Sequence, residues 1–214
     1  MSALAVPVRA ETADDGLLAY AVAILQTPAN SRSGAGIYLG KGLVLTAAHV
    51  VGGGIVNKPK VTIAGQDLTA TVVKQGAFER IDLALLEISE DRLPASLRAR
   101  HVTLCQARPW PGEEVITVVP EGTVRSHIMS PVWLPRNVRK FDTIISDVAQ
   151  TGNSGSGVFD AQKKCLLGIM SRKISETRTQ KDTGTKFTYD LAKYFVPAAT
   201  IAEFMPTGLD LDHE

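Results

Sequence analysis

The chain has 214 residues, of which 44% are hydrophobic and 21% are charged. This composition is typical of a packed globular protein and excludes a disordered chain. The net charge is +1, so the chain lacks the overall basic field that holds nucleic acid or an anionic membrane. No apolar stretch approaches the roughly 20 residues that a membrane-spanning helix needs.

The first ten residues leave the cellular compartment open. They end in the small-residue pattern of a signal-peptidase site, but their apolar part is short, is broken by Pro7 and lacks a basic leader. If residues 1–10 are the remnant of a trimmed signal, the protein is periplasmic or secreted, and otherwise it is cytoplasmic. We expect residues 1–16 to form an N-terminal arm.

Short apolar runs separated by turn residues fill the next part of the chain, residues 17–90. No helical periodicity interrupts them, and Gly40-Lys41 forms a two-residue turn between two of the runs. Closely spaced strands of this kind are typical of an all-β barrel or sandwich. The pattern predicts strands at residues 18–26, 36–39, 42–46, 61–64, 69–74 and 83–88.

The strand pattern stops over residues 91–110, which are charged and contain several prolines, and we expect a crossover linker there. A second set of six strands then fills residues 111–196. Two sequential six-stranded antiparallel barrels would close every sheet edge. Residues 197–214 are expected to form a short C-terminal helix, beginning at Pro197, and a tail. The second set of predicted strands covers residues 114–119, 124–128, 141–146, 157–159, 165–171 and 186–196.

The two cysteines, Cys105 and Cys165, are too few for a disulfide framework and lack the clustered spacing of a zinc site. Both lie beside leucines, so we expect two small buried thiols in preference to one disulfide. The distance between them does not follow from the sequence.

Three short segments carry residues suited to nucleophilic catalysis. Residues 151–157 place Ser154 between glycines, in a turn that leaves the backbone N–H groups of Gly152 and Ser154 free to stabilise an oxyanion. His49 ends an apolar run among small residues. Asp82 begins an apolar strand, where an ionised carboxylate needs a donor that a histidine would supply. Taken singly, the first segment is typical of a plain loop and the second of a structural histidine.

Together, the segments T-A-A-H-V, D-L-A-L-L and G-N-S-G-S-G, in the order His, Asp, Ser, resemble the chymotrypsin-like (trypsin-fold) serine proteases. The short separations between the three residues resemble the bacterial HtrA/Deg-type and glutamyl-endopeptidase-type branches. The resemblance covers residues 17–205 and the protease domain only, and we expect no PDZ module. It implies an all-β fold of two sequential barrels with a short C-terminal helix.

The resemblance also implies a role for each matching residue. Ser154 would be the nucleophile, His49 the general base and Asp82 the acid that orients the histidine. The N–H groups of Gly152 and Ser154 would form the oxyanion hole, and no metal or organic cofactor is implied. Asn153 stands where digestive enzymes carry an aspartate that pairs with a new N-terminus, so activation by N-terminal cleavage is not expected.

The specificity pocket is predicted from position alone. Counting back from Ser154, its floor falls near Val148 and Ala149, and neither is the aspartate that would select Arg or Lys. The pocket-lining strand continues through 171–173 (Ser171, Arg172 and Lys173) without the histidine of glutamyl endopeptidases. We expect a preference for Val, Ala or Leu before the cut. The alternative is an acidic preference through Arg172 or Lys173.

The sequence therefore predicts a serine endopeptidase that hydrolyses peptide bonds through an acyl-enzyme intermediate. Its partners would be protein or peptide substrates, with no nucleic acid and no membrane span. The alternative is a catalytically silent or latent trypsin-fold domain that acts as a protein-binding module. The oligomeric state does not follow from these residues.

Overall fold

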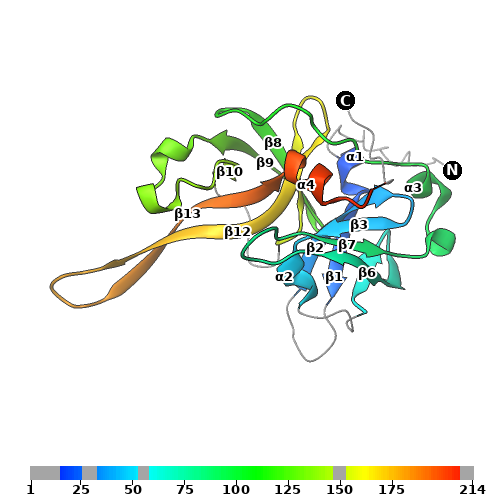
Figure 1. The fold of residues 1–214 in the computed structure, drawn as a ribbon, viewed down its shortest axis with the longest axis horizontal. Helices are drawn as coiled ribbons and strands as arrows, with labels where there is room; N and C mark the ends of the chain where they lie inside the picture. Colours follow the sequence, from blue (N-terminus) through cyan, green and yellow to red (C-terminus); the bar gives the residue numbers. More distant parts are fainter. Residues whose placement is uncertain (1–14, 26–32, 53–57, 147–152, 208–214) are drawn as a thin grey trace, which may run out of the picture.

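The computed structural model describes residues 15–25, 33–52, 58–146 and 153–207. Most of their regular structure is antiparallel β-sheet, arranged in two units that follow each other along the chain (Figure 1). The predicted all-β double barrel with a short C-terminal helix is confirmed. Most of the N-terminal arm expected at residues 1–16 lies outside the described residues.

The first unit is a seven-stranded antiparallel sheet in the order β5-β4-β1-β2-β3-β7-β6. It has one strand more than the sequence pattern predicts. The additional strand is β5, in which only Leu68 is buried, so its sequence gives no apolar run. Within the described part of the chain, β5 and β6 do not pair to close this sheet. The strands are β1 (Ala21–Leu25), β2 (Ser33–Gly40), β3 (Leu43–Thr46), β4 (Lys60–Ile63), β5 (Gln66–Thr69), β6 (Thr71–Gln75) and β7 (Ala84–Glu87).

The hairpin of β2 and β3 leads directly to the candidate histidine. Its turn is Lys41-Gly42, one residue later than predicted, and both residues have positive φ angles, 53° and 72°. Two-residue hairpin turns of this kind match the right-handed twist of the flanking strands. A Cβ on Gly42 would lie 2.7 Å from the carbonyl oxygen of Ile88. The turn therefore requires glycine there and fixes the register of the hairpin.

The second unit is a closed six-stranded barrel in the order β10-β13-β12-β11-β8-β9. Its last two strands run on past the barrel as a long two-stranded ribbon (Figure 1). The sequence pattern ended β12 at residue 171, because the residues after it are mostly polar. The strands are β8 (Glu114–Val119), β9 (Gly122–Met129), β10 (Ile144–Ile145), β11 (Gly157–Asp160), β12 (Leu166–Thr179) and β13 (Lys186–Pro197).

The helices of the described ranges are short, and none is long and apolar enough to cross a membrane. The C-terminal helix α4 begins one residue after Pro197, the predicted first residue. The helices are α1 (Asp15–Leu18), α2 (Ala48–Val51), α3 (Ala95–Arg98) and α4 (Ala198–Phe204), with 3₁₀ turns at Glu90–Arg92, Pro131–Trp133 and Arg136–Val138.

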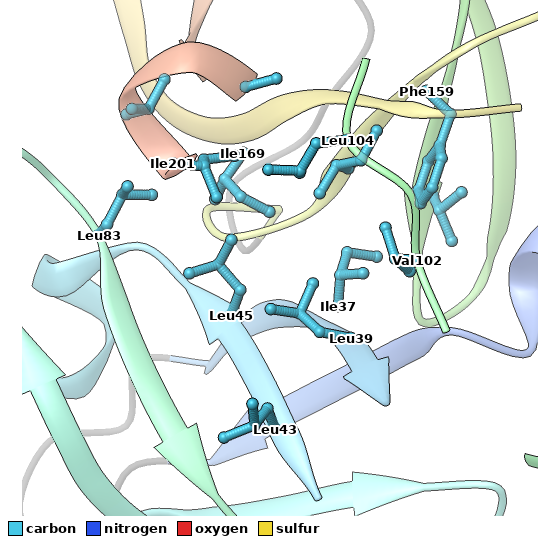
Figure 2. Packing of buried hydrophobic residues seen from close by; sticks show 14 of the residues in the cluster. Ile37, Leu39, Leu43, Leu45, Leu83, Val102, Leu104, Phe159, Ile169 and Ile201 are labelled. Carbon is cyan, nitrogen blue, oxygen red and sulfur yellow. The ribbon is translucent and has the colours of Figure 1, made fainter. Parts of the chain in front are cut away.

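One hydrophobic core joins the two units (Figure 2). Ile37 and Leu45 enter it from the first unit, Leu104 from the linker, Ile169 from β12 and Ile201 from α4, and each is at most 1% exposed. Burying each such side chain contributes about 1.5–3 kcal/mol. Because both units contribute to the same core, their facing surfaces are held in a fixed relation, as a site between them requires.

Cys105 and Cys165 form a disulfide, with their Cα atoms 5.1 Å apart. The expectation of two free thiols is therefore wrong. A parallel bridge between Leu104 and Leu166 brings the linker against the start of β12, and the N–H of Cys105 donates to the carbonyl of Leu166. The cysteines are 60 residues apart in sequence, and the spacing alone gives no sign of this bridge.

Removing the disulfide should destabilise the protein substantially. Replacing both Cys105 and Cys165 by Ala should lower the free energy of unfolding by about 4 kcal/mol, because the bond closes a long loop in the unfolded chain. Urea denaturation with and without reductant measures this difference. Wild type in reductant should match the double variant in buffer, and an unchanged denaturation midpoint in both would contradict the prediction.

Candidate active site

His49 and Asp82 meet at the end of the first unit. His49 lies on the four-residue helix α2, whose other three residues are buried, and its own side chain stays 30% exposed. Asp82 immediately precedes the apolar residues Leu83 and Ala84 and is only 1% exposed. The imidazole Nδ1 of His49 lies 2.8 Å and 3.1 Å from the two carboxylate oxygens of Asp82. The sequence prediction that these two residues interact is in agreement with this contact.

The Asp82 carboxylate accepts hydrogen bonds from both units. The backbone N–H of His49 donates to it at 3.1 Å, and the hydroxyl of Ser171, on β12, donates at 2.6 Å. Burial alone would raise the pKa of Asp82, but the hydrogen bonds from His49 and Ser171 hold that pKa below its usual value of 3.8. The carboxylate is therefore ionised at neutral pH and can only accept hydrogen bonds.

An acceptor-only carboxylate determines the tautomer of a neutral His49. Nδ1 must carry the proton that Asp82 accepts, which leaves the lone pair of Nε2 available on the other side of the ring. The ring is also held from its side by Phe78, which packs edge-on at a centroid distance of 5.3 Å. In this tautomer Nε2 is the acceptor nitrogen of the ring.

Ser154 lies in the loop that leads into β11, between the two units. Its carbonyl oxygen accepts from the N–H of Ala35, on β2, at 2.8 Å. The next residue, Gly155, donates its N–H to the carbonyl of Met170, on β12, also at 2.8 Å. Ser154 is thus tied to the first unit on one side. Through Gly155, the loop is also bonded to Met170 of β12, and the next residue of that strand is Ser171, whose hydroxyl donates to Asp82.

Gly155 permits this loop to lie as close as it does to β2. Its φ angle is +91°, and a Cβ there would lie 1.9 Å from the carbonyl oxygen of Ala35 and 2.3 Å from the hydroxyl of Thr46. Thr46 Oγ1 in turn donates to that same carbonyl at 2.6 Å. Any side chain at position 155 would push the Ser154 loop away from the first unit.

The described residues account for part of the predicted site. Gly152, Val148 and Ala149 lie outside them, so the second oxyanion donor and the pocket floor remain predictions. Ser154 is half-buried, and no hydrogen bond within the described part of the chain joins it to His49.

The three residues predicted to line the pocket have defined contacts. Ser171 is engaged with Asp82, and the ammonium of Lys173 pairs with Asp190 at 3.0 Å. Arg172 reaches the first unit, where it donates to the carbonyl oxygen of Phe78 and lies 4.2 Å from the centroid of that ring. The alternative that Arg172 or Lys173 selects an acidic residue before the cut stays a prediction.

Sequence reasoning missed Phe78 and the contact that Arg172 makes with it. Phe78 lies in a polar segment before Asp82, outside any apolar run, so no periodic signal marks it. Its contact with Arg172 spans 94 residues of sequence. The two side chains form a second link between the units beside His49, in addition to the bond between Ser171 and Asp82.

Comparison with known families decides the classification. Residues 34–169, more than half of the chain, match the family described as the trypsin-like peptidase domain. The chain belongs to the trypsin-like peptidase family. The matched segment of this trypsin-like peptidase domain contains His49, Asp82 and Ser154. No curated protein matches its sequence.

Solved structures share the fold of this trypsin-like peptidase domain at low sequence identity. The Rv3671c protease from M. tuberculosis in its active form has a TM-score of 0.60 and 17% identity, over 88% of this chain and 80% of the other. The serine endoprotease from Yersinia pestis has a TM-score of 0.60 and 18% identity, over 87% of this chain and 61% of the other.

The HtrA-type protease AlgW, solved with a tripeptide, has a TM-score of 0.61 and 20% identity. The match covers 87% of this chain and 58% of AlgW. This trypsin-like peptidase domain therefore spans only about three fifths of the length of the Yersinia and AlgW chains. At these identities the likeness concerns the fold, and it agrees with the HtrA-type, protease-domain resemblance seen in the sequence.

Ser171→Ala should weaken the fold in a pH-dependent way. The lost hydrogen bond to a charged acceptor should lower the free energy of unfolding by about 1.5–3 kcal/mol at neutral pH. The pKa of Asp82 is lowered from its usual value of 3.8, so the ionised carboxylate stabilises the folded state fully at a pH above 3.8. This stabilisation is lost as the pH falls through the lowered pKa. The gap between wild type and variant should therefore narrow at acid pH.

Urea denaturation at several pH values measures this gap. Ser175→Ala is the matched control, because Ser175 is an exposed serine of β12 that also donates to an aspartate, Asp190. It should leave stability nearly unchanged. A Ser171→Ala protein as stable as the control at neutral pH would contradict the assignment of this hydrogen bond.

Proposed function

We propose that this trypsin-like peptidase domain is a serine endopeptidase that works through Ser154, His49 and Asp82 and an acyl-enzyme intermediate. The observation that carries the proposal is the buried Asp82 carboxylate, which accepts from His49 Nδ1 at 2.8 Å and from Ser171 Oγ at 2.6 Å. This arrangement leaves Nε2 of His49 as the basic nitrogen of the ring. The match of residues 34–169 to the trypsin-like peptidase domain supports the same reaction class.

In the proposed reaction, Ser154 Oγ attacks the carbonyl carbon of the scissile peptide bond while His49 Nε2 takes the hydroxyl proton. The carbonyl oxygen becomes an oxyanion, which the backbone N–H groups of Gly152 and Ser154 would stabilise, each contributing about 3–4 kcal/mol in comparable sites. His49 then gives its proton to the leaving amine, and the C–N bond breaks. Water, activated by His49, hydrolyses the resulting ester and regenerates Ser154.

Each fixed contact has a consequence for this reaction. Asp82 stabilises the imidazolium that forms when His49 takes the serine proton, without becoming protonated itself. Phe78 covers one side of the imidazole ring and restricts its rotation. The hydrogen bond from Ala35 to the Ser154 carbonyl holds the nucleophile loop against the unit that carries the base. In structures without substrate, the serine–histidine contact is commonly longer than a hydrogen bond.

The disulfide bears on where such an enzyme would act. Disulfides persist in oxidising environments and are rare in the cytoplasm. The bond between Cys105 and Cys165 therefore favours the periplasmic or secreted alternative for this chain. Its substrates would be proteins or peptides of that compartment.

The alternative function is a catalytically silent or latent domain that binds proteins without cutting them. Such a domain would retain the bond between His49 and Asp82, but Ser154 would not be nucleophilic. The two proposals differ in a single chemical property, the reactivity of the Ser154 hydroxyl.

Labelling with a fluorophosphonate measures that property. Wild-type protein should take up one label, located on Ser154 by mass spectrometry of the digest, and should cleave peptides. Ser154→Ala and His49→Ala should each abolish labelling and nearly all turnover, and the double variant should be no worse than either, since the residues act as a unit. Asp82→Asn should cost on the order of 10⁴ in rate by imposing the wrong histidine tautomer.

Circular dichroism of each variant controls for unfolding. A folded wild-type protein without label would contradict the endopeptidase proposal and support the silent domain. Full activity in the Ser154→Ala protein would exclude Ser154 as the nucleophile.

A further inference from the structure

The ribbon formed by β12 and β13 extends far from the body of the molecule (Figure 1). Its base is anchored by Ile174 and Ala192, which are buried in a hydrophobic cluster of the second unit. Beyond this base, residues 175–179 pair with residues 186–190 in unbroken register, and almost all of them are exposed. An isolated two-stranded ribbon is only marginally stable in water, so a further strand that pairs with it adds stability.

The edge of β13 that faces away from β12, called here the outer edge of β13, is open along the ribbon. Next to the barrel, this edge pairs with β10 at Lys193 and Tyr194. From residue 186 to residue 192, no strand of the described ranges pairs with it. An unpaired strand edge is a template for pairing with another chain.

The hydrogen-bond pattern of the ribbon shows which residues present their backbone groups to this edge. At the tip, the N–H of Gln180 donates to the carbonyl of Thr185 at 2.8 Å. Opposed residues in an antiparallel ladder alternate between pairs that exchange hydrogen bonds and pairs that do not. Counting inward from the bonded pair at the tip, Lys186, Thr188 and Asp190 stand in non-bonded pairs with β12. Their N–H and C=O groups therefore point outward along the open edge.

The sequence of the outer edge of β13 is self-complementary about Thr188. A second copy, paired antiparallel around a two-fold axis at Thr188, would set the two Thr188 residues opposite each other and each Lys186 opposite the other copy's Asp190. The outward backbone groups of these three residues would form about six hydrogen bonds across the axis. Opposite charges at facing positions add to the stability of such a pair of strands.

The same pairing would cover exposed apolar surface. Phe187 and Tyr189 are 45% and 50% exposed, and because they are two residues apart on one strand they lie on the same face of the ribbon. Each Phe187 would lie opposite the Tyr189 of the other copy, at the non-bonded positions where facing side chains approach most closely. Aromatic pairs across neighbouring strands stabilise a sheet.

Other two-fold axes along this edge fit less well. An axis at Phe187 would set Asp190 opposite Gly184, and an axis at Tyr189 would set it opposite Thr188. Neither arrangement places a cation opposite Asp190. The axis at Thr188 alone among these three satisfies both the charged and the aromatic residues.

The outer edge of β12 is also less suited to a second copy. Its charged residues in the ribbon, Glu176 and Arg178, already pair with each other at 2.9 Å. Charged side chains on an edge strand are a common means of preventing edge-to-edge pairing. Residues 175–179 include no exposed large hydrophobic side chain like those at positions 187 and 189.

We infer that the outer edge of β13 is a dimer interface. Two copies of this chain pair antiparallel along residues 186–190, around a two-fold axis at Thr188, and join their ribbons into a single continuous sheet. The interface is isologous, because the same surface is used on both copies. The inference concerns assembly and does not depend on the proposed catalytic function.

Proline substitution at the axis tests this pairing. Thr188→Pro removes the outward N–H of the central residue and leaves the ladder between β12 and β13 intact, since that N–H does not face β12. Thr177→Pro is the matched control, because Thr177 is the residue opposite Thr188 on β12. It removes an outward N–H from the other edge and the same hydroxyl contact of 3.0 Å between the two threonines. Sedimentation velocity of the full chain at several concentrations measures the dimer.

Wild type should dimerise reversibly. Thr188→Pro should raise the dissociation constant of the dimer at least tenfold, because the hydrogen bonds at the axis are lost. Thr177→Pro should dimerise like wild type. A wild-type chain that stays monomeric at every concentration, or a dimer that Thr188→Pro leaves unchanged, would overturn the inference. A dimer weakened only by Thr177→Pro would assign the interface to β12 and would also overturn it.

Cysteine cross-linking gives a second readout, which holds even if the proline variant does not fold. Residues opposed in a bonded antiparallel pair have Cα atoms about 5.5 Å apart, within the range of a disulfide. Thr188→Cys should therefore give a disulfide-linked dimer under mild oxidation. In the same dimer the two copies of residue 177 are about 14 Å apart, so Thr177→Cys should not cross-link. The native cysteines are already bonded to each other.

No cross-link in Thr188→Cys, or equal cross-linking in both variants, would contradict the assigned axis. Fluorophosphonate labelling of Ser154 in the Thr188→Pro protein keeps this test separate from the proposed function. Labelling that persists while the dimer is lost would support the interface, and labelling without any dimer in wild type would overturn the interface and leave the proposed protease intact.

Discussion

A carboxylate buried in an apolar seam stays ionised only if enough donors replace the water it has lost. Asp82 is 1% exposed, and its donors come from α2 of the first unit and β12 of the second. Neither unit alone satisfies it. The contact therefore couples the orientation of His49 to the packing of the two units, and the core of Figure 2 holds that packing.

Other contacts around the site also join the two units. The bond between Ala35 and Ser154 and the close approach allowed by Gly155 bring the Ser154 loop to the first unit. Arg172 and Phe78 add a link beside His49. The disulfide fixes the linker to the start of β12, the strand that carries Ser171 and continues into the ribbon. One strand thus supplies a hydrogen bond to Asp82 and forms half of the ribbon.

Features that depend on residues close together in the sequence were predictable from local sequence patterns. β8 matched the predicted segment, and the three motif residues were singled out because their short motifs follow one another in the order His, Asp, Ser. Pairings between distant segments were not predictable: the disulfide joins residues 60 apart, and the bond of Ser171 to Asp82 spans 89. The ribbon was missed because its β12 half, exposed on both faces, has no alternation of apolar and polar residues. Cross-strand pairs hold such strands together, and these are invisible until the register is known.

The measurement that tests the central constraint most directly is proton NMR of the His49 ring. A proton held between Nδ1 and an ionised, buried Asp82 should give a resonance far downfield of the backbone amides. It should be present in wild type and in Ser154→Ala, shifted in Ser171→Ala, and absent in Asp82→Asn. If wild type showed no such resonance, or if the resonance persisted unchanged in Asp82→Asn, the His49–Asp82 contact would not organise the site and the account would be contradicted.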